Sequence, residues 1–133
     1  MFNSSYANLM NQVNLEYLKV ISNGDNEFML RTINSLIEEL QETTIHMQTH
    51  VLNNDWSSIS VYIHGIRPNL HLIGNKILID SFKMMEICAS SKANLKLLPF
   101  MVEEICDLSA EIISELEKEK QVLEYNFQKE QKK

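Results

Sequence analysis

Long stretches of this 133-residue chain place an apolar residue at every third or fourth position, and few residues interrupt them. The chain contains only three glycines and two prolines, so it has little of the turn chemistry that many short strands would require. No segment alternates apolar and polar residues with a period of two. This pattern predicts an all-α protein of long helices joined by short loops. A chain of this length can bury one core, so we expect a single domain.

Four long helical segments are predicted, and a short one precedes them. The short segment begins at an N-cap, Asn14, and ends at Asn23-Gly24; the next is capped by Asp25 or Asn26. Asp55 caps the third segment and Gly74 ends it. The expected core stripes are Met29, Ile33, Leu36, Leu40, Thr44, Met47 and Val51; Ile59, Ile63, Ile66, Leu70 and Ile73; Leu78, Phe82, Met85 and Ala89; and Met101, Ile105, Leu108, Ile112, Leu116 and Leu123.

Long helices that step back and forth through short loops describe an up-and-down antiparallel four-helix bundle, with the short N-terminal helix as a lid. We divide the chain into an N-terminal extension (1–13), the bundle (14–120) and a charged C-terminal helical tail (121–133). The tail alternates charge signs, as a solvated helix does.

Composition excludes several classes of function. The net charge of −6 argues against a nucleic-acid partner, because no basic stripe is present. No apolar run is long enough to span a membrane. The N-terminus lacks the charge and apolar region of a signal peptide, and Cys88 and Cys106 do not make a disulfide framework. We therefore expect a cytoplasmic monomer with both cysteines reduced.

One histidine lies away from the core stripe of its helix. At about 100° per residue, His64 falls roughly 145° from the middle of the stripe formed by residues 59–73, so it should face water. Arg67 lies one turn on and His71 two turns on. An exposed imidazole, with an ordinary pKa of about 6.5, is largely neutral at pH 7 and can act as a nucleophile. A cation one turn away could hold a transferred phosphoryl group.

A proline follows at position 68, inside the same predicted helix. Proline removes the backbone hydrogen bond to the carbonyl of His64 and disfavours α geometry at Arg67. Either the helix restarts at Pro68 or it is kinked there. We favour the kink, because the apolar stripe keeps its phase across the proline.

The segment "IHGIRPNLHLIG" resembles the signature of histidine-containing phosphotransfer (HPt) domains. In that signature a histidine is followed by a basic residue at +3, a small residue or proline at +4 and a glycine at +10; here these are His64, Arg67, Pro68 and Gly74. The segments Asn14–Leu40 and Asn54–Arg67 are similar to the family's leading helices and its approach to the histidine. Glu86 stands where members often carry an acidic residue.

The resemblance implies a phosphocarrier that has no catalytic activity of its own. It would accept a phosphoryl group on His64 from the aspartate of a response-regulator receiver domain, or of a hybrid sensor histidine kinase, and pass it to another receiver. Arg67 would be the electrostatic support, and Ser60, Gly65, Pro68, His71 and Gly74 would form the docking surface. No cofactor is implied; Mg²⁺ is expected only on the partner receiver domain.

Two other interpretations remain open. The chain could be a helical interaction module that binds a receiver or kinase without accepting phosphate, which the uncommon Ile63 and Pro68 favour. His46 and His50 have the i,i+4 spacing of a metal-binding pair, but the sequence offers no evident third ligand, so we expect no metal site.

Overall fold

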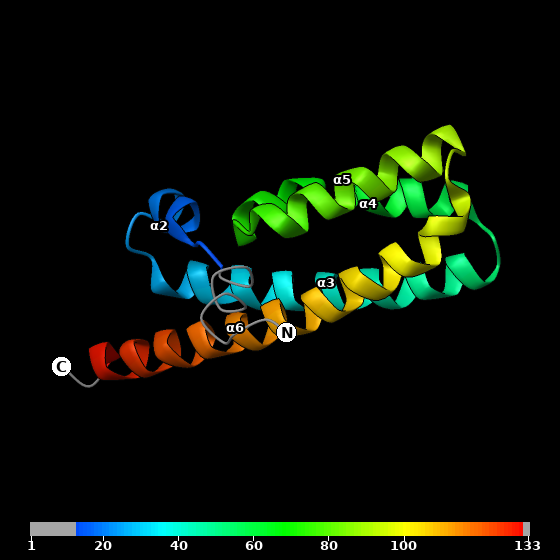
Figure 1. Cartoon of the computed structure of the whole chain (residues 1–133). Coiled ribbons are helices and arrows are strands. Elements are labelled where there is room, and N and C mark those ends of the chain that lie inside the picture. The colour runs from blue at the N-terminus through cyan, green and yellow to red at the C-terminus, as the bar shows by residue number, and fades with distance from the viewer. Residues whose placement is uncertain (1–12, 132–133) are drawn as a thin grey trace, which may run out of the picture.

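The structure is a computed structural model that describes residues 13–131, and all regular secondary structure in that range is helical (Figure 1). The elements are α2 (Glu16–Ser22), α3 (Asn26–Leu52), α4 (Trp56–Ile73), α5 (Lys76–Ser91), a 3₁₀ turn η1 (Leu95–Leu97) and α6 (Leu98–Gln131). The predicted all-α class is confirmed for the described residues. Of the predicted extension only Val13 is described, and the last two residues of the tail also lie outside the described range.

Side-chain caps set the start of α3 and of α4. Asp25 accepts a hydrogen bond from the backbone N–H of Phe28 at the start of α3, and Asp55 accepts one from Ser58 at the start of α4. These caps were predicted from sequence. Asn14, however, is not the N-cap of α2. The N-cap position is occupied by Leu15. Asn14 lies one residue before this cap, and its side-chain oxygen accepts a hydrogen bond from the backbone N–H of Glu16.

Successive long helices run in opposite directions, as Figure 1 shows. Helix α3 packs against α4 and α6, and α5 packs against the same two helices. The short α2 lies near the beginning of α3 and contacts it. The end of α6 reaches the start of α3, where the Asn26 side-chain nitrogen donates to Glu130 Oε1 at 3.1 Å. This arrangement makes α4 and α5 neighbours along their length.

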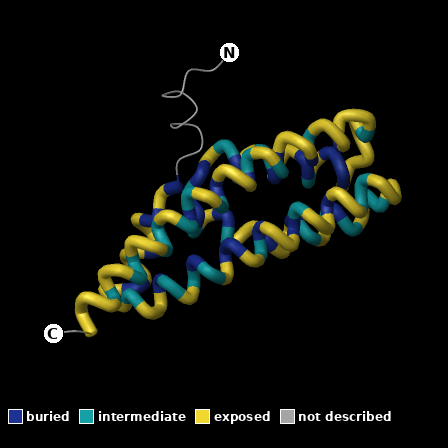
Figure 2. The backbone as a smooth tube through the Cα atoms, turned by 90° about the horizontal axis from the view of Figure 1, so that it is seen from below, coloured by how far each residue is buried: buried dark blue, intermediate teal, exposed yellow. Residues whose placement is uncertain are grey.

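The buried residues face the space between the helices, and the last turns of α6 are largely exposed (Figure 2). Every predicted core residue of α4 and α5 is buried. The stripes of α3 and α6 differ in detail. Thr43 is buried and Thr44 is not, which corrects the prediction, and Val51 is half-buried. In α6, Met101, Leu108 and Leu123 are half-buried, whereas Val102 and Ser109 are buried.

A small rotation explains these differences. Residues next to each other on a helix differ by about 100°, so the neighbours of a helix decide which side of a broad apolar stripe becomes fully covered. In α6 the covered side passes through Ser109, a residue that hydropathy alone does not select. Periodicity therefore predicted the buried face but not its centre.

Helix α4 is one continuous helix from Trp56 to Ile73, with Pro68 inside it. The helix therefore does not end before Pro68 and begin again there. Because proline has no N–H, the carbonyl of His64 lacks its ordinary partner within the helix. The missing bond lies beside His64, on the helix that carries the candidate site.

Both cysteines are free; Cys88 is buried and Cys106 is half-buried. Burial raises the pKa of the Cys106 thiol, and the charge of Asp107 raises it further. Within residues 13–131, no helix combines the length and the apolar character needed to cross a membrane.

Candidate functional site on helices α4 and α5

His64 lies in the middle of α4 with 81% of its side chain exposed. Its neighbours on the core side, Ile63 and Ile66, are buried in the same helix. The predicted exposure of the imidazole is confirmed. The ring is therefore open to a reagent or to another protein from solution.

Glu86 on α5 brings a carboxylate to the same place. One carboxylate oxygen, Oε2, lies 4.0 Å from His64 Nδ1, and the other, Oε1, lies 3.0 Å from Arg67 Nη1. The Glu86 side chain is only 16% exposed, so it is held between the two helices. The contact with His64 is too long for a hydrogen bond but short enough for electrostatic attraction. With Nδ1 near the carboxylate, Nε2 is the nitrogen left for other chemistry.

Arg67 is close to His64, as its spacing predicts, but it is not a free cation. Its side chain is 45% exposed and one guanidinium nitrogen donates to Glu86. A guanidinium has five N–H donors, so this bond leaves most of them available. The sequence marked Glu86 as an acidic position, but it gave no sign that this residue bridges His64 and Arg67.

Two serines meet on the N-terminal side of His64, one from α4 and one from α5. Ser60 is half-buried, and its hydroxyl lies 2.8 Å from the hydroxyl of Ser90 on α5, close enough for a hydrogen bond in either direction. Ser90 was not predicted as a site residue. Its role depends on α5 lying beside α4, and no pattern within the sequence around Ser90 reveals that contact.

Three predicted docking residues lie on the exposed part of α4. Gly65, Pro68 and His71 are all exposed. A Cβ atom placed on Gly65 would meet nothing within 4 Å, so the surface beside His64 is open. These residues could contact a partner that approaches the imidazole.

Gly74 has a different role. It ends α4 with φ of +71°, and a Cβ there would collide with the backbone oxygen of Asn14. The N–H of Asn14 also donates to the carbonyl of Ile73 at 3.0 Å. Gly74 is thus needed for the chain before α2 to pack on the end of α4.

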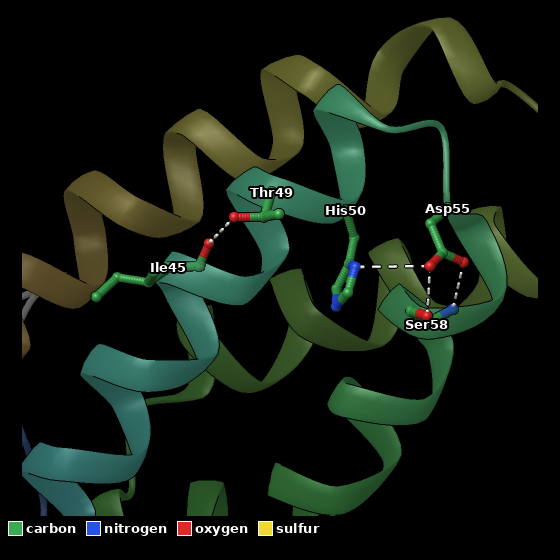
Figure 3. Close-up of polar contacts among 5 residues, drawn as sticks. All are labelled: Ile45, Thr49, His50, Asp55 and Ser58. Carbon is green, nitrogen blue, oxygen red and sulfur yellow. Dashed lines mark hydrogen bonds and ion pairs between the residues drawn. The ribbon is translucent and has the colours of Figure 1, made fainter.

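The two histidines considered as a metal-binding pair, His46 and His50, lie near the end of α3. Figure 3 shows His50 at the α3–α4 corner. His50 is 18% exposed, and its Nδ1 lies 3.6 Å from Asp55 Oδ2. Its Nε2 is buried without a hydrogen-bond partner. The rings of His46 and His50 stack beside Tyr62, with the His46 and Tyr62 centroids 4.7 Å apart.

Asp55 belongs to the same corner, and its carboxylate is stabilised by hydrogen bonds. The Ser58 hydroxyl donates to it at 2.6 Å and the Ser58 backbone N–H at 3.2 Å. These two bonds lower the pKa of Asp55, and the nearby His50 lowers it further. Among residues 13–131, no three His, Cys, Asp or Glu side chains are placed to hold a metal ion.

In comparisons with known proteins, no family model, no curated protein and no solved structure matches the chain. The candidate site is therefore interpreted from its own geometry and from the sequence pattern that carries it.

Proposed function

We propose that this chain is a histidine phosphotransfer protein of a two-component phosphorelay. In this proposal His64 accepts a phosphoryl group from a receiver-domain aspartate and passes it to another receiver. The main observation in support is that the imidazole of His64 is 81% exposed, with Arg67 and Glu86 beside it. The protein would act as a cytoplasmic monomer without catalytic activity of its own.

The fold that we propose for this role is an up-and-down four-helix bundle of α3, α4, α5 and α6, with α2 as the lid. The alternating directions of these helices support it, as do the contacts that each makes with two others. A bundle of this kind presents the middle of one helix as a rigid, exposed surface. The middle of α4 is where His64 lies.

The geometry supports one course for the transfer. The lone pair of Nε2 attacks the phosphorus of the aspartyl phosphate, a P–N bond forms, and the P–O bond to the aspartate breaks. The aspartate leaves as a carboxylate. The proton on Nδ1 stays there, and the positive charge that develops on the ring faces the carboxylate of Glu86. Transfer to the next receiver reverses these bond changes.

Arg67 would support the phosphoryl group through its unused N–H donors. Such charge-assisted hydrogen bonds are stronger than neutral ones, and the guanidinium lies one turn from His64. The incoming phosphoryl group would compete with Glu86 for Arg67. The metal ion and remaining carboxylates would come from the receiver domain, and Ser60, Gly65, Pro68 and His71 would meet its surface.

The alternative is an interaction module that binds a receiver or kinase without accepting phosphate. One observation favours it: Glu86 already pairs with Arg67 at 3.0 Å, so the cation that should meet the phosphoryl group is partly neutralised. The two functions differ in whether phosphate is found on the protein.

A transfer assay separates them. The full chain is mixed with a phosphorylated receiver domain, and acid-labile, base-stable phosphate on the chain is measured. We expect labelling that His64→Ala abolishes and His46→Ala, at an exposed histidine on α3, leaves intact. Arg67→Gln should slow labelling by about tenfold, the equivalent of one lost charge-assisted hydrogen bond.

Absence of label from a panel of receivers that still bind the chain would contradict the phosphocarrier function. The interaction module would then be the better description. Equal labelling of the His64→Ala variant would place the phosphate on another residue and would also contradict the proposal.

A further inference from the structure

A small hollow lies between α4 and α5, one turn beyond Arg67 from His64. Its volume is about 150 Å³. Arg67 and His71 on α4 and Lys83 on α5 lie at its edges. The hollow thus shares Arg67 and the docking residue His71 with the candidate site, and its other lining residues are different.

The floor of the hollow is apolar. Leu70 and Phe82 are almost fully buried, and Ile79 is half-buried beside them. An apolar floor favours a ligand that brings a short hydrocarbon part with it. A bare inorganic ion has nothing to place there.

The rim carries more positive than negative charge, although the whole chain has a net charge of −6. Lys83 makes no ion pair or hydrogen bond with any residue in the described range, and Arg67 retains unused donors after its bond to Glu86. His71 adds a ring nitrogen that can donate. Asp80 is the single acidic residue among those that line the hollow. The hollow should therefore favour an anion, which both Arg67 and Lys83 can attract.

We propose that this hollow receives an acidic side chain, a glutamate or aspartate, from a protein that docks over His64. The carboxylate would lie between Arg67 and Lys83, and its methylene groups would rest on Leu70 and Phe82. The partner's identity as a receiver rests on the proposed function, but the hollow's chemistry does not. The docked acid would share Arg67 with Glu86, so docking and the electrostatics of His64 would be coupled.

Selection of a partner follows from this chemistry. A partner with a basic residue at the matching position would meet Lys83 and Arg67 with like charge, which disfavours the complex. The hollow would thus contribute to choice among otherwise similar partners, while His64 would carry the transfer.

The inference can be tested on the full chain by ¹H–¹⁵N NMR, without phosphotransfer. The probe is sodium butyrate, a carboxylate on a short alkyl stem. Butyramide, sodium chloride and inorganic phosphate are the comparisons, with pH and ionic strength matched. We expect butyrate to shift the backbone amides around Leu70 and Lys83 most, with smaller effects from butyramide and phosphate.

Variants connect the response to the hollow. Lys83→Gln should weaken the butyrate response by about two- to fivefold, the contribution of one exposed ion pair. Asp80→Asn should strengthen it. Lys118→Gln, at an exposed lysine on α6, is the matched control and should leave it unchanged. Unchanged helical circular dichroism would establish that each variant folds.

Three outcomes would overturn the inference. They are a butyrate response that Lys83→Gln does not reduce, an equal response to butyramide, and a stronger response to phosphate at the same amides. The last would mean that the hollow takes a free oxyanion. None of these measurements uses phosphate transfer. A negative result would therefore not bear on the function of His64, which the transfer assay tests separately.

Discussion

Two histidines on neighbouring helices have very different surroundings. His64 on α4 is 81% exposed, and the carboxylate of Glu86 approaches only its Nδ1. His50 on α3 is 18% exposed; its Nδ1 lies near Asp55, and its Nε2 is buried without a partner. Both rings have an acidic neighbour on the same nitrogen. They differ in whether the second nitrogen can be reached from solution.

That difference assigns the two residues to different roles. An imidazole can act as a nucleophile only if a donor can reach its lone pair, which holds for Nε2 of His64. The ring of His50 instead fills space beside Tyr62 and contacts the residue that caps α4. Whether a donor can reach the second ring nitrogen, more than which acid lies near the first, separates a candidate reactive histidine from a packing residue.

The largest contrast is expected in stability. His50→Ala should lower the free energy of unfolding by about 1–3 kcal/mol, because a mostly buried ring is lost from the corner. His64→Ala should change it by no more than about 0.5 kcal/mol, since that ring is exposed. Urea unfolding of both variants measures this, with His71→Ala as a control at another exposed histidine on α4. Equal losses at positions 50 and 64 would end the distinction.

Chemical modification provides a direct test of access. Diethyl pyrocarbonate acylates neutral imidazole nitrogens, and mass spectrometry of peptides measures the rate at each histidine. We expect His64 to react at least about tenfold faster than His50, because the corner must open before His50 Nε2 can be reached. His71, also exposed, should react at a rate like that of His64. Comparable rates at His50 and His64 would show that the corner is not closed.

A smaller effect is expected at Gly65, which lies on the open side of α4. Gly65→Ala should stabilise the protein by about 0.5–1 kcal/mol, because alanine favours a helix interior and its Cβ meets nothing within 4 Å. Gly74→Ala is the opposing control and should destabilise, because its backbone needs a positive φ and its Cβ would collide with Asn14. Thermal unfolding measures both. A destabilised Gly65→Ala variant would mean that the face around His64 is not open.

The smallest effect concerns the acid side of the pH range. The pKa of Asp55 is lowered in the folded protein, chiefly by the Ser58 hydroxyl. The resulting stabilisation is fully present above the unfolded value of about 3.9 and is lost as the pH falls through the lower folded value. Ser58→Ala should therefore shift acid unfolding, followed by circular dichroism, to slightly higher pH. Ser57→Ala, an exposed serine in the same turn, should not.

Much of the fold could be predicted because it depends on local pattern. The apolar spacing of α4 and α5 identified their buried residues, and Asp25, Asp55 and Gly74 marked helix ends through their own backbone and capping chemistry. The exposure of His64 followed from its angle on α4. The site was predicted less fully, because the bond of Arg67 to Glu86 and the contact of Ser60 with Ser90 both depend on how α5 packs against α4.

Local sequence pattern suffices to predict the helices, the buried faces of α4 and α5, and the exposure of His64, because each depends on residues within a few turns of one another. Which side of the α3 and α6 stripes is covered follows from the packing of the helices against each other. The tertiary structure also decided that Glu86 joins His64 to Arg67, that Ser60 meets Ser90, and that His50 is enclosed. Each of these depends on how one helix is rotated and placed against another. Packing between helices settles that rotation, and no single helix encodes it.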